Sequence, residues 1–276
     1  MICAVKELLS ILPGWLRQEL DEATVTNLQE IRLRLHGTAE LVLRNTSKRL
    51  SKTVTKEDLQ FCINAASRYS PWNAASAASG YLTSQGGHRI GICGEAVCKE
   101  GQMTGIREVT SLCIRVAKDF HGISEGIPID CSILILGAPG WGKTTLLRDL
   151  IRRISQTGHH ISVVDERQEL FPAAIFDHGP RTDILSGCPK GDGIDTVLRT
   201  MGPEWIAVDE ITEETDCNAL LRAGWCGVRL LATAHAATYR DYLSRPVYRP
   251  LVESRLFDSV IILRPDKTWR IERGIP

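Results

Sequence analysis

A glycine-rich loop between a strand pattern and a helix pattern constrains this chain more than any other feature. Within Ser132–Thr145, four apolar residues precede the spacing Gly137-x-x-x-x-Gly142-Lys143-Thr144. Apolar residues then recur at helical spacing, at Leu146, Leu147, Leu150, Ile151 and Ile154. A strand, this loop and a helix in that order form the P-loop motif, and a chance glycine match would lack the flanking elements.

The residues of the loop suit phosphate chemistry. Its glycines let the backbone turn sharply and bring N–H groups toward phosphate oxygens, at the positive end of the following helix. Lys143 is expected to reach the β- and γ-phosphates, and the Thr144 hydroxyl to ligate Mg²⁺. We therefore predict a site for ATP and Mg²⁺ whose nucleotide-binding residues are Gly137, Ala138, Pro139, Gly140, Trp141, Gly142, Lys143, Thr144 and Thr145.

The composition is that of an ordinary globular chain of 276 residues, 43% of them hydrophobic. Lys+Arg and Asp+Glu number 33 each, so net charge gives no argument for broad nucleic-acid or membrane-surface binding. The chain has no apolar run of 18 residues and no signal-peptide pattern. Its nine cysteines show no Cys-x-x-Cys spacing. We expect reduced thiols in a cytoplasmic protein rather than a zinc site.

Residues 1–120 predict a smaller α+β domain. An apolar stripe including Leu8 and Leu12 predicts a first helix, which either packs on its own domain or binds a partner. Ile31–Leu35 and Glu40–Arg44 alternate as a hairpin would. The basic residues 45–56 fit a solvated loop, an edge strand or a phosphate-contacting patch.

A second helix and further strands complete that domain in the sequence. Thr55 and Asp58 have capping-box spacing at the start of a helix. Residues 86–94 are glycine-rich but lack the Gly-Lys-Thr ending, so they predict a turn entering a strand, with Arg89 projecting from it. Arg115 lies within another strand pattern, Ser111–Ala117. We assign residues 121–130 to a linker and 131–276 to the P-loop domain.

Beyond the P-loop, strand patterns alternate with helix patterns. Candidate strands are Ile161–Val164, Trp205–Val208 and Arg229–Thr233, with a closing hairpin of Ser259–Leu263 and Thr268–Ile271. This alternation predicts an α/β domain with a largely parallel sheet. Ligands of such sheets bind at the carboxyl ends of the strands, where the conspicuous polar residues of this chain fall.

Asp209 and Glu210 end the Trp205–Val208 strand, as in a Walker B motif. We expect Asp209 to hold the Mg²⁺ shell and Glu210 to orient a water for in-line attack on the γ-phosphorus. Asp165 and Glu166 end a neighbouring strand. They support the metal or the water, or they cap a helix or pair with Arg167. His235, with Thr233, is placed to sense the γ-phosphate or has a structural role.

One requirement of P-loop chemistry is unmet within the P-loop domain. Transition-state charge is usually neutralised by an additional cation, and after the Walker B strand only Arg222 and Arg229 stand out. Arg89 and Arg115 precede the P-loop domain. They are candidate arginine fingers, acting on this site or on that of a neighbouring copy, or they are ordinary surface arginines.

The motifs together resemble the stage III sporulation protein AA family, which comprises RecA-like P-loop ATPases related to type II/IV secretion and pilus-retraction ATPases. The resemblance rests on the P-loop, Val164–Glu169, Met201–Glu210 and Thr233–Ala236, and on Glu30–Arg34, Gly86–Gly91 and Ile114–Lys118 in the N-terminal domain. It covers nearly the whole chain. The residues around Glu166 differ from the Asp box of the secretion ATPases.

The resemblance implies a RecA-like core and a hexameric motor at the inner face of a membrane. The motor would energise assembly or transport through a sporulation channel whose integral membrane proteins are its partners. It also implies that Glu166, His235, Arg89 and Arg115 serve the nucleotide site with Lys143 and Glu210. The residues themselves leave two alternatives, namely a nucleic-acid-dependent ATPase and an ATP-binding scaffold or switch with little turnover. Neutral charge and an aromatic content of 6% disfavour nucleic acid.

Overall fold

A computed structural model describes residues 2–67, 80–99, 102–173 and 176–273. They fall into two compact units, one built mainly from residues 2–119 and the other mainly from residues 120–273. Within these described ranges, no helix is both long and apolar enough to cross a membrane.

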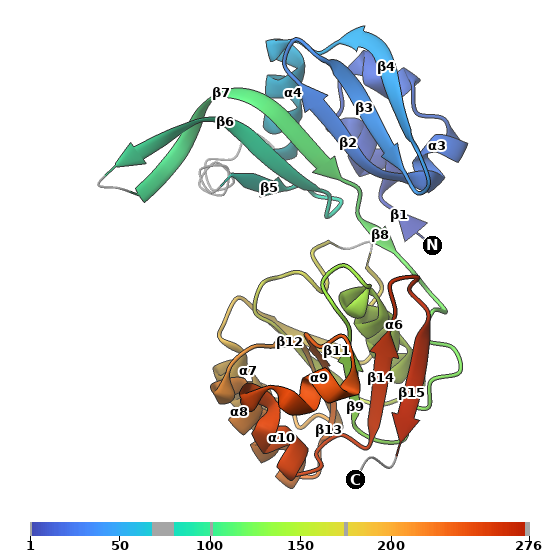
Figure 1. Ribbon diagram of the computed structural model, residues 1–276, viewed down its shortest axis with the longest axis vertical. Coiled ribbons are helices and arrows are strands. Elements are labelled where there is room, and N and C mark those ends of the chain that lie inside the picture. The colour runs from blue at the N-terminus through green and yellow to red at the C-terminus, as the bar shows by residue number, and fades with distance from the viewer. Residues whose placement is uncertain (1, 68–79, 100–101, 174–175, 274–276) are drawn as a thin grey trace. The chain divides into compact units, whose positions relative to one another are not determined.

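The first unit is an antiparallel sheet of six strands in the order β4-β3-β2-β7-β6-β5 (Figure 1). Its strands are β2 (Leu28–Arg34), β3 (Thr38–Leu43), β4 (Ser47–Thr53), β5 (Tyr81–Thr83), β6 (Arg89–Lys99) and β7 (Gln102–Arg115). A separate antiparallel pair joins β1 (Ile2–Cys3) to β8 (Lys118–Asp119). The helices are α1 (Val5–Ser10), α2 (Gly14–Gln18), α3 (Glu22–Asn27) and α4 (Lys56–Ser67).

Local sequence signals produce several of these elements as predicted. The β2–β3 hairpin buries Ile31 and Leu33, and the basic segment 45–56 supplies the edge strand β4. At the start of α4, Asp58 N–H donates to Thr55 Oγ1 at 3.3 Å and Thr55 N–H donates to Asp58 Oδ2 at 3.0 Å. The predicted capping box is therefore confirmed, with Asp in the place of the usual Glu.

The predicted first helix packs on its own unit. Leu8 and Leu12 are fully buried in a core that also contains residues of β2, β3, β6 and β7. The partner-binding alternative for this apolar stripe is not needed, because the stripe already faces a core. Beyond this core, β6 and β7 continue as an extended hairpin (Figure 1), and residues 93–99 of β6 are exposed throughout.

The second unit contains a sheet of seven strands in the order β11-β10-β12-β13-β9-β14-β15. The strands are β9 (Ile133–Leu136), β10 (Ile161–Asp165), β11 (Thr182–Ser186), β12 (Trp205–Ile211), β13 (Arg229–Ala234), β14 (Ser259–Leu263) and β15 (Trp269–Arg273). Adjacent strands are parallel except for the antiparallel pair β14–β15. The predicted parallel sheet and closing hairpin are confirmed.

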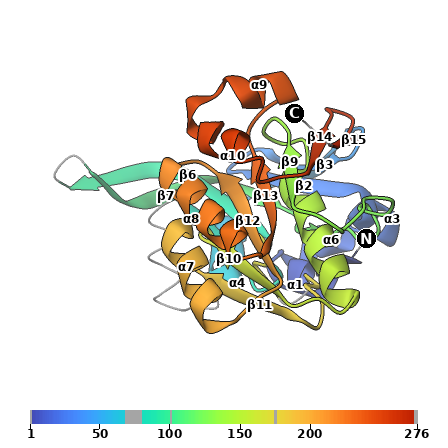
Figure 2. The same cartoon turned by 90° about the horizontal axis from the view of Figure 1, so that it is seen from below.

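Helices cover both faces of this sheet (Figure 2). Helix α6 (Lys143–Gln156) packs its apolar stripe on one face, where Ile133 and Ile135 of β9 point. Leu134 and Leu136 point to the other face. That face is covered by α7 (Lys190–Thr200), α8 (Glu214–Trp225), α9 (Tyr239–Ser244), the 3₁₀ turn η1 (Pro246–Tyr248) and α10 (Arg249–Glu253). Burial on both faces explains why β9 is a continuous apolar run.

The segment that enters the second unit is bound to α6. The buried Asp149 carboxylate accepts hydrogen bonds from the N–H groups of Gly122 and Ser124, at 3.1 and 2.8 Å. Arg153, one turn later on α6, donates to the carbonyl oxygens of Ser124 and Ile127. These contacts fix much of the stretch that the sequence assigns to a linker onto the P-loop helix.

Several helices and strands of the structure are not predicted by the sequence patterns. They include α3, β11, α7, α9 and α10. Strand β11 lies at the edge of the sheet and buries no residue fully, so it shows little apolar pattern. Helix α7 contains two glycines, which weaken its helical signal, but Gly193 permits a close approach to Val164 of β10, whose Cγ1 would lie 2.5 Å from an added Cβ.

Candidate active site

The P-loop lies at the carboxyl end of β9, between the ends of β13 and β14. Gly140 and Gly142 have φ angles of +78° and +99°, which a residue with a side chain rarely adopts, so the glycine spacing is a backbone requirement. Gly142 is the N-cap of α6, and Lys143 is the first helical residue. The Lys143 ammonium donates to the carbonyl oxygens of Gly137 at 2.9 Å and Ala138 at 3.3 Å. Partial burial lowers the pKa of Lys143.

Asp209 of β12 joins the P-loop to the end of β13. Thr144 Oγ1 donates to Asp209 Oδ2 at 2.8 Å, across 65 positions of sequence. Thr233 Oγ1, near the end of β13, donates to Asp209 Oδ1 at 2.6 Å. The hydroxyl and carboxylate predicted to hold the metal are therefore in direct contact.

Glu210 follows on a distorted strand end. Pairing between β12 and β13 shifts register between Val208 and Ile211, and Glu210 has a φ of +49°. Its N–H donates to Thr233 Oγ1 at 2.7 Å. Thr233 is thus hydrogen-bonded to both members of the acidic pair. The shift in register forms a bulge at which Glu210 departs from ordinary strand geometry. Bulges and left-handed residues of this kind are frequent beside active sites.

The Glu210 carboxylate lies between two basic side chains. His235 Nε2 is 3.4 Å from Glu210 Oε1, and a guanidinium nitrogen of Arg167 is 3.7 Å from Glu210 Oε2. Burial and the Lys143 charge lower the pKa of His235. The lowered pKa favours a neutral imidazole beside the Glu210 carboxylate.

The acidic pair at the end of β10 has different surroundings. Asp165 is buried, and its carboxylate accepts backbone N–H groups of Glu169, Leu170 and Phe171 at 2.9, 2.9 and 3.4 Å. No helix begins in the described residues 166–173, so the helix-capping alternative is wrong, and Asp165 instead binds the N–H groups of the loop that follows it. Glu166 pairs with the buried ammonium of Lys190 at 2.5 Å. The alternative that this pair binds Arg167 is wrong, because the ion-pair partner of Arg167 is Glu210.

Arg89 and Arg115 belong to the first unit, where they face each other across β6 and β7. Arg115 approaches Glu30 Oε1 at 3.5 Å, and the Arg89 guanidinium lies 4.7 Å from the centroid of the Tyr81 ring. The Arg115 side chain is 66% exposed. The two arginines are thus register partners on neighbouring strands, one beside a carboxylate and the other over an aromatic ring.

The donor atoms at the P-loop edge fit Mg²⁺. They are the Thr144 hydroxyl and the Asp209 carboxylate, both oxygen ligands, beside a phosphate-binding loop. Among the described residues, no cluster of three or more His, Cys, Asp or Glu side chains could hold a metal unaided.

Three residues to which the sequence patterns assign no role in nucleotide chemistry support the site. Arg167 and Lys190 pair with the acidic residues, and Tyr248 OH lies 3.3 Å from the carbonyl oxygen of Ile211. Tyr248 stacks on Tyr242, with ring centroids 5.0 Å apart. Charged residues near strand ends could have suggested Arg167 and Lys190, whereas nothing in the sequence indicates Tyr248.

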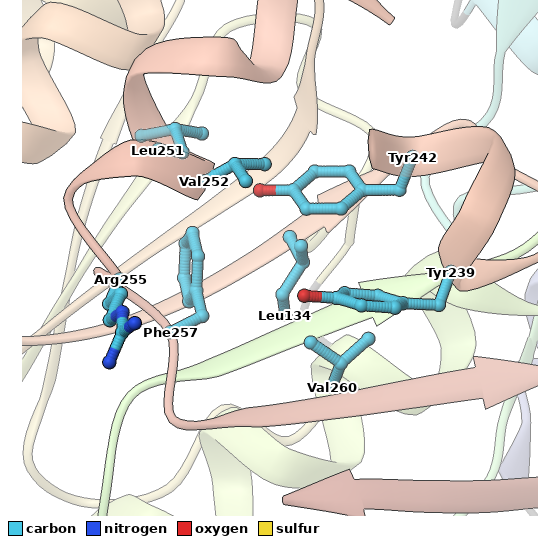
Figure 3. A pocket seen from close by; sticks show the side chains of 8 residues that line it. All are labelled: Leu134, Tyr239, Tyr242, Leu251, Val252, Arg255, Phe257 and Val260. Atoms are coloured by element: carbon cyan, nitrogen blue, oxygen red, sulfur yellow. The ribbon is translucent and has the colours of Figure 1, made fainter. Parts of the chain in front are cut away.

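A small cavity adjoins this tyrosine cluster (Figure 3). Tyr239 and Tyr242 of α9 extend across it from one side, and Leu134, Val260 and Phe257 line it with residues of α10. Its volume of about 20 Å³ suits a single water rather than a nucleotide. Burial raises the pKa of both tyrosines, so their hydroxyls stay protonated.

Comparisons with known proteins agree with this architecture. A chain 34% identical over 279 residues is the stage III sporulation protein AA of Bacillus subtilis, and the alignment covers 94% of this chain and 91% of that one. The ATPase DotB of Legionella pneumophila has a TM-score of 0.64 at 17% identity, covering 95% of this chain and 80% of DotB. The pilus retraction motor PilT, solved with ADP, has a TM-score of 0.60 at 18% identity, covering 86% and 74%.

The structural likenesses confirm the predicted RecA-like α/β fold. The family model described as sporulation stage III, protein AA, matches residues 4–275, nearly the full sequence. With the Bacillus subtilis relative, this match confirms the resemblance drawn from the motifs. The chain belongs to the stage III sporulation protein AA family.

Proposed function

We propose that this chain is a Mg²⁺-dependent ATPase. The observation that carries the proposal is the hydrogen-bonded chain from the P-loop to Walker B. Thr144 contacts one oxygen of Asp209, and Thr233 contacts the other oxygen and the Glu210 N–H. A chance glycine turn would not place these groups in contact.

Each group has a role consistent with its geometry. The N–H groups of the P-loop and the Lys143 ammonium hold the phosphates. Thr144 and Asp209 would hold Mg²⁺, which would supply positive charge against the charge that develops on the phosphates. Glu210 accepts a proton from the attacking water, and the neutral His235 orients that carboxylate and contacts the γ-phosphate.

We further propose that ATP hydrolysis drives a homo-oligomeric, secretion-ATPase-like motor. DotB is an ATPase and PilT is a retraction motor, and both share the fold. The family relationship supports the proposal that the motor is a hexameric ring on the inner face of a membrane and acts on integral membrane proteins of a sporulation channel. Arg89 and Arg115, which are register partners on β6 and β7, would serve such a ring as fingers, because a guanidinium binds phosphate oxygens.

The test is steady-state ATP hydrolysis by the purified chain, with nucleotide binding measured in parallel. We expect turnover that stops on chelation of Mg²⁺ and is lost in Lys143→Ala. Single-stranded DNA or RNA should not stimulate it. Absence of turnover by an intact chain that binds ATP and assembles would favour a scaffold or switch. A pull-down from membranes with Glu210→Gln, trapped with ATP, should recover an integral membrane protein.

A further inference from the structure

The second unit supplies a cation of its own next to Glu210. We propose that Arg167 contacts the γ-phosphate of the nucleotide bound to the same chain and neutralises charge in the transition state. The inference rests on the proposed ATPase function and adds a catalytic residue to it. It complements Arg89 and Arg115, which belong to the first unit.

The loop that carries Arg167 is built rigidly. Gln168, with φ of +55°, closes a turn in which its N–H donates to the Asp165 carbonyl oxygen at 3.2 Å. The Asp165 carboxylate binds three successive N–H groups after it. The burial of Asp165 is thus explained by the loop that it shapes, which presents Arg167 at the carboxyl edge of the sheet.

The P-loop helix braces the same loop. Arg148, one helical turn after Thr144, donates to the carbonyl oxygens of Glu169 and Leu170. Strand β10, which precedes the loop, is the direct neighbour of β12, which carries Glu210. The base of the Arg167 side chain is therefore fixed relative to both the P-loop helix and Walker B.

The guanidinium itself is free to change partner. The Arg167 side chain is 61% exposed, and its pair with Glu210 has a separation of 3.7 Å. An exposed pair of this length contributes little free energy, so a phosphate can displace it. A guanidinium also binds phosphate oxygens through two parallel N–H groups.

Lys190 and Arg245 are two further cations of this unit, and both have committed partners. Lys190 is buried between Glu166 at 2.5 Å and Asp216 at 3.6 Å. Arg245 forms two hydrogen bonds to Asp241, at 3.0 and 3.1 Å. In the described part of the chain, Arg167 and His235 are the basic side chains at ion-pair distance from the Glu210 carboxylate, and Arg167 is the one with a permanent charge.

The first test compares Arg167→Ala and Arg167→Lys with the native chain. We expect kcat to fall about 10²–10³-fold in Arg167→Ala, with less loss in Arg167→Lys. Binding of ATP should weaken while the Kd of ADP stays unchanged, because the contact is to the γ-phosphate. The control is Arg249→Ala, which removes an exposed arginine paired at 3.3 Å with Glu253 on α10. It should retain full turnover.

A mixing experiment tests action within one chain. Arg167→Ala chains mixed with Lys143→Ala chains should stay inactive, because no chain has both an intact P-loop and Arg167. Recovery of turnover in the mixture would overturn same-chain action, and unchanged kcat in Arg167→Ala would overturn the contact. If the native chain shows no turnover, the proposed function fails. The ATP and ADP affinities then still decide whether Arg167 contacts the γ-phosphate.

Discussion

Two acidic pairs lie near the carboxyl ends of neighbouring strands of one sheet, and their hydrogen-bond and ion-pair partners differ in kind. Asp209 and Glu210 end β12 and bind side-chain hydroxyls or face basic side chains. Asp165 and Glu166 end β10, where Asp165 binds backbone N–H groups and Glu166 binds a buried lysine. The two Asp-Glu sequences are identical, but one pair lines the P-loop edge and the other shapes a loop.

The difference comes from what surrounds each strand end. After Asp165 the chain turns back sharply, so its carboxylate meets the N–H groups of Glu169 and Leu170. After Val208 a bulge displaces the chain, and the nearest donors to Asp209 are Thr144 and Thr233. A strand-end carboxylate is thus available for metal or water only where its own loop does not occupy it.

Glu210→Gln should give the largest difference in turnover between variants of the two acidic pairs. We expect turnover to fall about 10²–10⁴-fold while ATP still binds, because the amide cannot accept the proton from water. The measurement is single-turnover hydrolysis beside equilibrium ATP binding. Glu166→Gln is the matched variant. A larger loss of kcat from Glu166→Gln than from Glu210→Gln would reverse the assigned roles.

Asp209→Asn should mainly change the Mg²⁺ dependence of turnover, whereas Asp165→Asn should mainly change stability. Asp209→Asn is expected to raise the Mg²⁺ concentration needed for half-maximal turnover by about 10–100-fold, with little change in stability. Asp165→Asn should lower the free energy of unfolding by about 1.5–3 kcal/mol, because a charged acceptor of three N–H groups is lost. Mg²⁺ titrations and denaturant unfolding check both. Equal effects of the two variants would contradict the contrast.

Thr233→Val tests the hydroxyl that joins Asp209 to Glu210. Thr233 is fully buried, so the change leaves the Glu210 N–H without its acceptor in a space of nearly constant volume. We expect a loss of about 1–3 kcal/mol in stability, together with reduced turnover. Thr233→Ser keeps the hydroxyl and should restore turnover. Equal turnover in the Val and Ser variants would remove Thr233 from the site.

The smallest effect concerns acid pH. Burial lowers the pKa of His235 in the folded state, so below about pH 6.5 the unfolded chain binds a proton that the folded chain resists. Stability from this group is complete above that pH and declines as pH falls toward the folded pKa. His235→Gln should therefore lose less stability than the native chain between about pH 7.5 and 5.5, measured by thermal unfolding. An identical decline in both chains would contradict the assignment.

Much of this architecture follows from the sequence because its signals are local. The apolar run before Gly137, the glycines of the loop and the capping box at Thr55 each specify their own geometry. The contacts of the site depend on distant parts of the chain. Thr144 meets Asp209 through the order of strands in the sheet, and Arg167 meets Glu210 because β10 lies beside β12. No pattern within one segment contains that information.

The attachment of residues 122–127 to α6 has a mechanical consequence. Asp149 and Arg153 fasten this segment to the helix whose first residue is the P-loop lysine. A pull transmitted along the chain from residue 119 therefore loads α6 before it can stretch the segment 128–132. Conversely, if α6 moved during nucleotide exchange, Gly122 would move with it, because Asp149 on α6 is hydrogen-bonded to the Gly122 N–H. Motion of the P-loop helix and motion of residues 122–127 are thus coupled through the Asp149 and Arg153 side chains.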